Sequence, residues 1–421
     1  MPLTYPRPSL LREIADNCGT PVMIYDEDAL RQTMREYTGS FKSEMFETSV
    51  LYASKAFLCK AMAKAALEEG LHFDAVSGGE IYCLAGAGVS AEKIHFHGNN
   101  KTPREIEEFF RMGRGHIIVD NCDELTLVIE TAERMASPMD IIIRVNPGVE
   151  AHTHEYIATA TKDSKFGISI DREDEIRRMI EAAENCPHLS FKGFHSHIGS
   201  QILEVEAFAA EIRVMFDFVD RVQQQWGVEV EELDLGGGFA ISYTEKDNPP
   251  ATEEVCSRII ALCEEEITRR KLDIRRLMIE PGRSIAGDAG YTLYTAGCRK
   301  MTDSKSFIFV DGGMADNIRP ALYNAEYTCR NITRDNAKAD RTYALAGKCC
   351  ESGDILIKEA RLPETFPGDL ILVHSTGAYG YSMASNYNRL PRPAVVFTSG
   401  ESYRTVIRRE TYEDMMTLDV E

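Results

Sequence analysis

Short apolar segments alternate with amphipathic stretches between residues 49 and 283. The apolar segments are residues 49–56, 71–77, 93–98, 116–121, 140–146, 190–199, 231–239 and 275–283. Strands that alternate with helices pair in parallel, because each helix returns the chain to the edge where the next strand starts. Eight strands close a (β/α)8 barrel. The long gap at residues 147–189 predicts an insertion in the fifth loop.

After residue 286 the pattern becomes one of β-rich segments punctuated by Gly, Pro and Asp. These segments are residues 291–298, 306–313, 341–350, 353–360 and 369–375. They predict a second, all-β domain. Residues 20–30 predict a further strand and the start of the first barrel helix. We therefore predict an α/β plus all-β protein, with a TIM-like barrel at residues 30–285 and a β-rich domain made of residues 1–29 and 286–421.

Composition restricts the classes of partner. The chain has 47 Lys and Arg against 67 Asp and Glu, a formal charge of −20, which repels phosphate backbones and makes nucleic acid an unsuitable partner. The 11 cysteines include no C-x-x-C pair and are expected to be free thiols in a reducing compartment. Apolar runs of signal-peptide or membrane-spanning length are absent from the sequence, so we expect a cytoplasmic protein without a membrane partner.

Lys55 ends the first predicted strand, at the rim where a barrel collects its catalytic groups. An ammonium on an apolar strand is costly to bury unless its charge is compensated or removed. Forming an imine with an aldehyde removes that charge. Lys55 is therefore a candidate cofactor-bearing amine, and the alternative is an ordinary lysine that points into water at the strand edge.

Other predicted strand ends offer matching groups. The glycines at 236–238 can wrap a phosphate with their N–H groups, helped by Arg283 on the next strand end; the alternative is a tight turn. Glu280 can keep a pyridine nitrogen protonated, or it pairs with Arg283. His197 can stack on a flat cofactor, or it is a core histidine.

Three H-x-H pairs, in contrast, have the spacing of metal ligands. They are His95 with His97, His152 with His154, and His195 with His197. A barrel metallohydrolase would also use an aspartate at the end of its last strand, where this chain has Glu-Pro-Gly-Arg, and the glycine triplet has no role in such a site. We predict no metal.

Seven motifs in order resemble those of the fold-type III pyridoxal-phosphate-dependent decarboxylases. They are ASKA (53–56), HSHIGSQ (195–201), LDLGGGF (233–239), EPGR (280–283), RPALY (319–323), CESGD (350–354) and GAYG (377–380). The resemblance runs over almost the whole chain and depends on the conjunction of the motifs. It implies an alanine racemase-like barrel with a C-terminal β domain, and pyridoxal 5′-phosphate as cofactor.

The resemblance also implies roles for individual residues. Lys55 would bind the cofactor covalently, His197 would stack on its ring and Glu280 would meet the ring nitrogen. The residues implied to hold the phosphate or otherwise contact the cofactor are Ser200, Gly237, Gly282, Arg283 and Tyr379. The residues implied to bind substrate are Arg283, Arg319, Tyr323, Glu351 and Tyr379.

Cys350 is implied to be the proton donor, although a structural thiol is the default for such a residue. In this family the CESGD segment reaches into the partner's site. The resemblance therefore implies a homodimer with shared active sites. It also implies that the β-rich domain contributes to the substrate site and to the dimer interface.

The implied reaction is decarboxylation of meso-2,6-diaminopimelate to L-lysine and carbon dioxide, the last step of lysine biosynthesis. Arg283, Arg319 and Glu351 together can hold a second carboxylate, which favours this substrate over ornithine, lysine, arginine or carboxynorspermidine. A non-catalytic cofactor carrier and an amino-acid racemase are further alternatives. Ala160, Lys348 and Tyr327 depart from the family pattern and leave open an altered substrate preference.

Overall fold

The computed structural model describes residues 5–149 and 164–420 and contains two compact units. The barrel unit consists of Thr33–Ala240 and Pro249–Gly282, and the β-rich unit consists of Met1–Gln32, Ile241–Asn248 and Arg283–Glu421. Ile241–Asn248 lies inside the range expected for the barrel but belongs to the β-rich unit. The reason is local packing, since the rings of Tyr243 and Tyr327 meet edge to face with centroids 5.5 Å apart.

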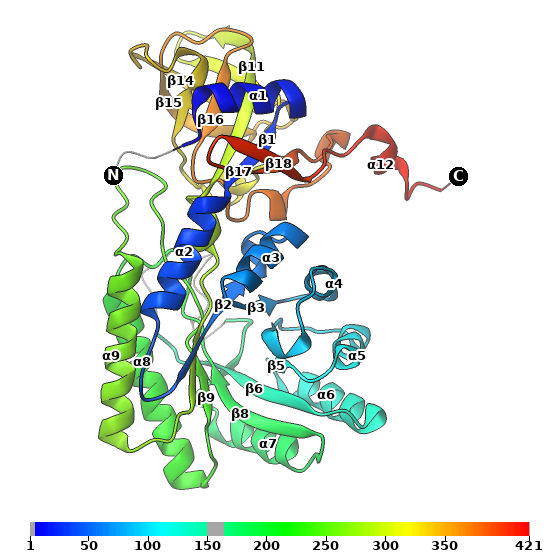
Figure 1. Cartoon of the computed structure of the whole chain (residues 1–421), viewed down its shortest axis with the longest axis vertical. Helices are drawn as coiled ribbons and strands as arrows, with labels where there is room; N and C mark the ends of the chain where they lie inside the picture. Colours follow the sequence, from blue (N-terminus) through cyan, green and yellow to red (C-terminus); the bar gives the residue numbers. More distant parts are fainter. Residues whose placement is uncertain (1–4, 150–163, 421) are drawn as a thin grey trace. The chain divides into compact units, whose positions relative to one another are not determined.

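The barrel unit is a closed ring of parallel strands, as the sequence predicts (Figure 1). Its strands are β2 (Glu47–Ala53), β3 (His72–Ala75), β4 (Ile94–Phe96), β5 (His116–Val119), β6 (Met139–Asn146), β8 (Leu189–His195), β9 (Glu232–Asp234) and β10 (Arg276–Ile279). They pair in the order β5-β4-β3-β2-β10-β9-β8-β6, and a β5–β6 pairing closes the ring. Every residue of β6 is buried, as expected for a strand that is covered on both faces.

Helices follow or precede these strands along the chain. They are α2 (Glu27–Ser40), α3 (Lys60–Glu68), α4 (Gly78–Gly86), α5 (Pro103–Met112), α6 (Cys122–Met135), α7 (Glu173–Glu184), α8 (Val205–Arg221) and α9 (Thr252–Arg270). Local sequence sets their ends: Thr102 and Glu105 form a capping box at the start of α5, and Gly113 follows its last residue. A short π-helix (Val222–Trp226) extends α8.

The insertion after β6 contains β7 (Ile168–Ser169), which pairs with the end of β6, and α7 follows it. The histidines His152 and His154 and the departure at Ala160 fall outside the described residues.

The β-rich unit is built around one mixed sheet. Its strands are β1 (Val22–Asp26), β11 (Gly290–Met301), β12 (Ser306–Val310), β13 (Cys329–Asn331), β14 (Arg341–Ala346), β15 (Ile355–Leu362), β16 (Leu370–Val373), β17 (Ala394–Ser399) and β18 (Ser402–Ile407). The main order is β15-β14-β12-β11-β1-β17-β18, with β16 joining β11 to β13. The N-terminal strand β1 lies between β11 and β17, so the two ends of the chain build one sheet.

Short helices complete the β-rich unit. They are α1 (Pro8–Cys18), α10 (Arg283–Ala286), α11 (Arg319–Tyr323) and α12 (Tyr412–Met416). Leu10, Leu11 and Ile14 of α1 pack into a core with residues of β1, β11 and β17.

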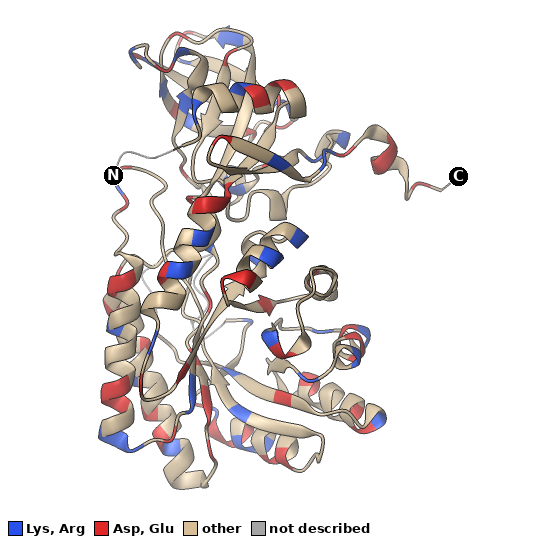
Figure 2. Ribbon diagram, viewed as in Figure 1, with Lys and Arg blue, Asp and Glu red and all other residues tan. Residues whose placement is uncertain are grey.

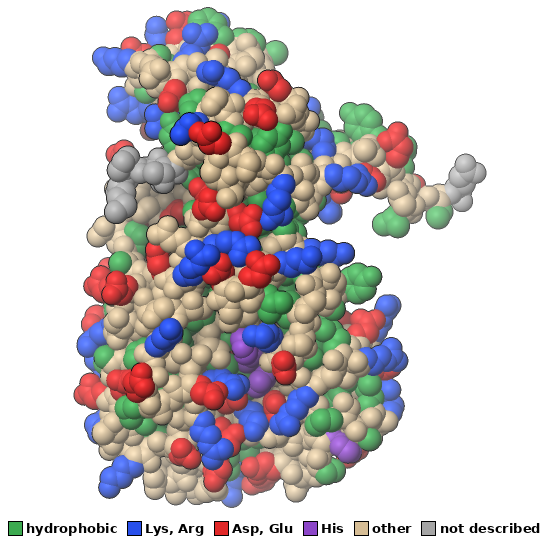
Figure 3. Space-filling model, in the orientation of Figure 1, with side chains coloured by type: hydrophobic (Ala, Val, Ile, Leu, Met, Phe, Trp, Pro, Cys, Tyr) green, Lys and Arg blue, Asp and Glu red, His purple; other side chains and the backbone are tan. Residues whose placement is uncertain are grey.

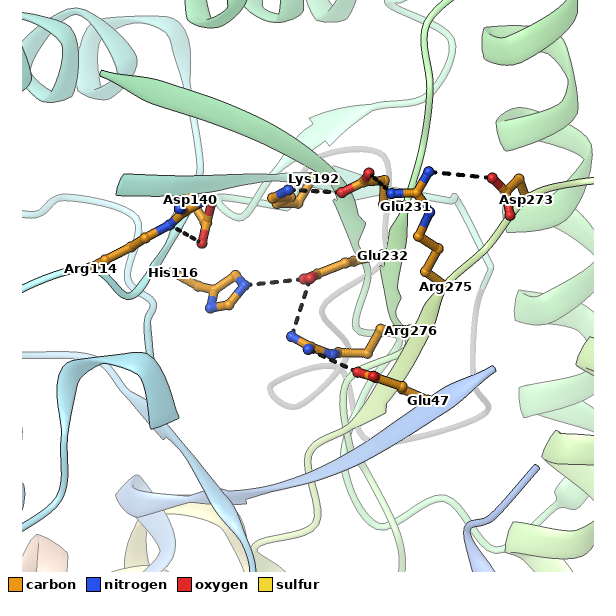
Figure 4. A network of polar contacts seen from close by, with 10 residues as sticks. All are labelled: Glu47, Arg114, His116, Asp140, Lys192, Glu231, Glu232, Asp273, Arg275 and Arg276. Atoms are coloured by element: carbon orange, nitrogen blue, oxygen red, sulfur yellow. Dashed lines mark hydrogen bonds and ion pairs between the residues drawn. The ribbon is translucent and has the colours of Figure 1, made fainter. Parts of the chain in front are cut away.

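Polar contacts tie together the first residues of several barrel strands (Figure 4). Glu232 at the start of β9 lies 3.2 Å from His116 at the start of β5 and 3.2 Å from Arg276 at the start of β10. Arg276 also lies 3.1 Å from Glu47 at the start of β2. This network stands at the amino-terminal ends of the strands, the end of a barrel associated with stability rather than with chemistry.

Acidic and basic side chains are interspersed along the barrel helices (Figure 2), and both occupy the surface seen in Figure 3. Among the described residues, no helix combines the length and the apolar character needed to cross a membrane.

Candidate active site

Lys55 lies in a single 3-10 turn, Ser54–Ala56, that directly follows β2. Its side chain is 42% exposed, and its Nζ lies 3.8 Å from Oδ2 of the buried Asp74 at the end of β3. The amine is thus accessible to a ligand while a carboxylate on the neighbouring strand faces it. Asp74 was not singled out from the sequence, because one aspartate in a short strand carries no motif.

Glu280, directly after β10, is the centre of a buried polar cluster. Its Oε1 lies 2.8 Å from Nε2 of His97, and its Oε2 lies 3.3 Å from Nε2 of His195. With Asp234, these side chains come within 4.8 Å of one another. Each of them follows or ends a barrel strand, so closure of the barrel brings together residues that are far apart in sequence.

The cluster concentrates negative charge on Glu280. Burial alone would raise the pKa of this carboxyl, but the nearby His97 and His195 hold the pKa of Glu280 well below its usual range. Burial raises the pKa of Asp234 well above its ordinary value and lowers the pKa of His195 to about 3. An ionised carboxylate therefore sits at the carboxyl ends of the strands, where it can hold a proton on a ligand nitrogen.

The loops after β8 and β9 approach each other too closely for side chains. The N–H of Gly237 donates to Nδ1 of His197 at 3.2 Å, and a Cβ at Gly237 would stand 2.1 Å from the carbonyl oxygen of Glu280. A Cβ at Gly238 would stand 2.5 Å from the oxygen of Gly199, the residue before Ser200. The absence of side chains in the glycine triplet thus lets the loop after β9 pack closely against the residues that follow β8 and β10.

The end of β10 makes a similar approach to the end of β2. A Cβ at Gly282 would lie 2.7 Å from the Cβ of Ala53, and the Ala53 N–H donates to the oxygen of Pro281 at 3.2 Å. An amine, an ionised carboxylate and glycine backbone loops therefore share one end of the barrel, and this donor set fits pyridoxal phosphate.

The same cluster agrees in part with the alternative of a metal site. His97, His195, Asp234 and Glu280 have the residue types of a metal site. His95 and His97 do not act as a pair, however, since His95 stacks on His116 with ring centroids 4.3 Å apart while His97 joins the cluster.

Two arginines and three tyrosines gather within the β-rich unit. Arg319 donates from Nη1 to the hydroxyl oxygens of Tyr243 at 2.8 Å and Tyr327 at 2.9 Å. Arg283 also donates to Tyr243. Both guanidinium groups lie over the ring of Tyr379, at 4.9 Å for Arg283 and 5.7 Å for Arg319. The N–H donors of two guanidinium groups and a flat ring suit a carboxylate on a planar ligand.

Tyr243 is a member of this cluster that sequence reasoning missed, since it lies in a segment assigned to the barrel. Tyr327, noted only as a departure from the family pattern, is an acceptor for Arg319. Tyr323 ends α11 and is half-buried. Its relation to a substrate stays a prediction.

Cys350 and Glu351 are exposed in the loop between β14 and β15. The buried Asp354 builds this loop by accepting the N–H groups of Cys349 at 2.8 Å and Met314 at 2.7 Å. The loop is therefore ordered although the side chains at its tip face outward.

Comparison with known proteins identifies the class. The family described as "Pyridoxal-dependent decarboxylase, pyridoxal binding domain" matches residues 29–287. Diaminopimelate decarboxylases of Bacillus subtilis and Staphylococcus aureus are 45% and 42% identical to this chain, each over 97% of it and over 93% and 96% of their own lengths.

Among solved structures, diaminopimelate decarboxylase of M. jannaschii in complex with L-lysine has a TM-score of 0.90 and 33% identity, covering 97% of this chain and 94% of that one. The barrel, the lysine and the buried carboxylate thus define a pyridoxal-phosphate-dependent decarboxylase of fold type III. Within that class, the chain belongs to the diaminopimelate decarboxylase family. The cofactor is pyridoxal phosphate. That the histidine and carboxylate cluster serves this cofactor rather than a metal stays a prediction.

Proposed function

We propose that this protein removes a carboxylate from meso-2,6-diaminopimelate and releases L-lysine and carbon dioxide. The observation that carries the proposal is the buried, ionised Glu280 held by His97 and His195 at the strand ends that also present Lys55. The family relationship supplies the substrate. Bound pyridoxal phosphate supplies an electron acceptor for the carbon that loses the carboxylate.

The chain's own residues then have separable tasks. Lys55 binds the cofactor through its amine, and Glu280 holds a proton on the ring nitrogen. His197, whose Nδ1 accepts the Gly237 N–H, is thereby fixed for stacking on the ring. Ser200, Gly237 and the backbone at Gly282 and Arg283 hold the phosphate.

Substrate recognition belongs to the β-rich unit in this proposal. Arg283, Arg319 and Tyr323 bind a substrate carboxylate, and Tyr379 contacts both cofactor and substrate. Cys350 donates the proton that replaces the carboxylate, and Glu351 binds the distal amino-acid centre. Because Cys350 and Glu351 are exposed on their own subunit, a homodimer in which each loop completes the partner's site accounts for them. A cytoplasmic location stays a prediction.

A substrate panel tests the proposal. Purified protein supplied with pyridoxal phosphate is assayed for carbon dioxide release from meso-diaminopimelate, ornithine, lysine, arginine and carboxynorspermidine, with the Lys55→Ala variant as control. We expect preferred turnover of diaminopimelate, and a borohydride-reduced cofactor label on Lys55. Faster release from ornithine, or a label on another lysine, would contradict it.

A further inference from the structure

Backbone strain is concentrated in one loop of the β-rich unit. Eight non-glycine residues have positive φ among those described, and Ser375, Tyr379, Asn388 and Arg389 belong to the loop between β16 and β17. Such conformations cost on the order of 1–3 kcal/mol each and persist where surrounding contacts impose them. The strain thus points to a function of the loop, and Tyr379 already has a proposed one.

Asn388, at φ 54°, is the member of this set that reaches the Cys350 loop. Its Oδ1 accepts the backbone N–H of Cys350 at 2.8 Å. Several other N–H groups of that loop bond within the hairpin itself: Gly347 donates to the oxygen of Asp354 at 3.0 Å, Cys349 to Oδ2 of Asp354 at 2.8 Å, and Glu351 to the oxygen of Cys349 at 2.8 Å. Asn388 thus braces the exposed tip of the loop from outside the hairpin.

Arg389 has the same φ of 54° but serves a different contact. Its Nη1 donates to the oxygen of Met415 at 2.9 Å, and its Nη2 to Asp419 at 3.0 Å. Two consecutive left-handed residues therefore send one side chain to the Cys350 loop and the other to the C-terminal segment. Arg389 therefore provides a matched control for substitutions of Asn388, because it has the same φ.

We propose that Asn388 is a positioning residue whose side-chain carbonyl fixes the backbone of Cys350 and so the place from which its thiol donates a proton. This inference rests on the proposed function of Cys350. A general acid must stand within hydrogen-bond reach of the atom it protonates, and a small displacement lowers the rate without weakening substrate binding. Asparagine suits the position because it tolerates left-handed backbone and offers an acceptor.

Two substitutions at Asn388 distinguish the effect of losing the hydrogen-bond acceptor from the effect of changing the backbone conformation. Asn388→Gly keeps the left-handed conformation without a steric cost but removes Oδ1, whereas Asn388→Asp keeps an acceptor oxygen. We expect Asn388→Gly to lower kcat for meso-diaminopimelate about tenfold with KM and cofactor absorbance unchanged. Asn388→Asp should restore most of kcat, and Arg389→Gly should leave it near the wild-type value.

Hydrogen–deuterium exchange of the peptide containing Cys350, in the cofactor-loaded protein, tests the contact independently of activity. Asn388→Gly should speed exchange of one amide about tenfold or more, and Asn388→Asp should not. Unchanged exchange in Asn388→Gly, or equal loss of kcat in Arg389→Gly, would overturn the inference. If Cys350→Ser kept full activity, the proposed role of Cys350 would fail instead, while the exchange result would still decide the contact.

Discussion

Nε2 of His97 lies 2.8 Å from Oε1 of Glu280, and both side chains are almost completely removed from solvent. His97 is the strongest of the influences that lower the pKa of Glu280 against the effect of burial. The charge of the proposed ring-nitrogen carboxylate is therefore maintained by a histidine at the end of β4, which is separated from β10 by the two strands β3 and β2.

His97→Asn should shift the acidic limb of the kcat–pH profile. Without the imidazole, burial dominates and the pKa of Glu280 rises, so the ionised form is lost at a higher pH than in the wild type. We expect the limb to move upward by about one pH unit or more. In Glu280→Gln, which has no carboxyl to titrate, the acidic limb of the profile should be absent. If the limb of His97→Asn stays at the wild-type pH, His97 does not control the pKa of Glu280.

Tyr243→Phe should weaken substrate binding more than it slows chemistry. The change removes the oxygen that accepts from both Arg283 and Arg319, and it leaves two buried cations less fixed. We expect KM for diaminopimelate to rise about tenfold with a smaller change in kcat. Tyr327→Phe removes an acceptor of one arginine only, so it should raise KM less. A larger increase of KM in Tyr327→Phe than in Tyr243→Phe would argue against the Tyr243 hydroxyl as the shared acceptor of both arginines.

Mixing two inactive variants tests the shared site. Lys55→Ala and Cys350→Ala subunits, coexpressed to form mixed dimers, should recover about a quarter of wild-type activity, because about half of the dimers then contain one intact site. Each variant alone supplies the control. Mixed dimers as inactive as either parent would mean that Lys55 and Cys350 act within the same subunit.

Glu211→Gln should change the pH dependence of stability. Glu211 accepts the Ser196 hydroxyl at 2.7 Å, and burial raises its pKa from 4.5 to about 8. The folded state thus keeps a proton that the unfolded state releases, and wild-type stability falls as pH rises across this window.

As the pH rises from 4.5 to about 8, the variant should therefore become more stable relative to wild type. The difference between their free energies of unfolding should grow by up to about 1.4 kcal/mol per pH unit. Urea unfolding at several pH values measures the difference. Glu206→Gln, an exposed change on the same helix, is the control, and a pH-independent difference for Glu211→Gln would contradict the expectation.

The barrel strands were predictable because each is a short apolar run next to an amphipathic helix, a pattern that depends on local periodicity. Lys55 and Glu280 could be proposed for the same reason, since each directly follows such a run. Asp74 and Asp234 could not, because their significance depends on which strands become neighbours. The sequence places Tyr243 in the barrel because its segment follows β9, but Tyr243 belongs to the β-rich unit, where its ring packs against that of Tyr327.

Local periodicity and motif order in the chain were sufficient to establish the barrel, the β-rich domain, the family and the cofactor. Only the tertiary structure decided that His97 and His195 hold Glu280, that Tyr243 bridges two arginines, and that Asn388 reaches Cys350. Periodicity reports which face of an element is buried, whereas these contacts arise when barrel closure and sheet pairing bring together residues whose separation in sequence carries no signal.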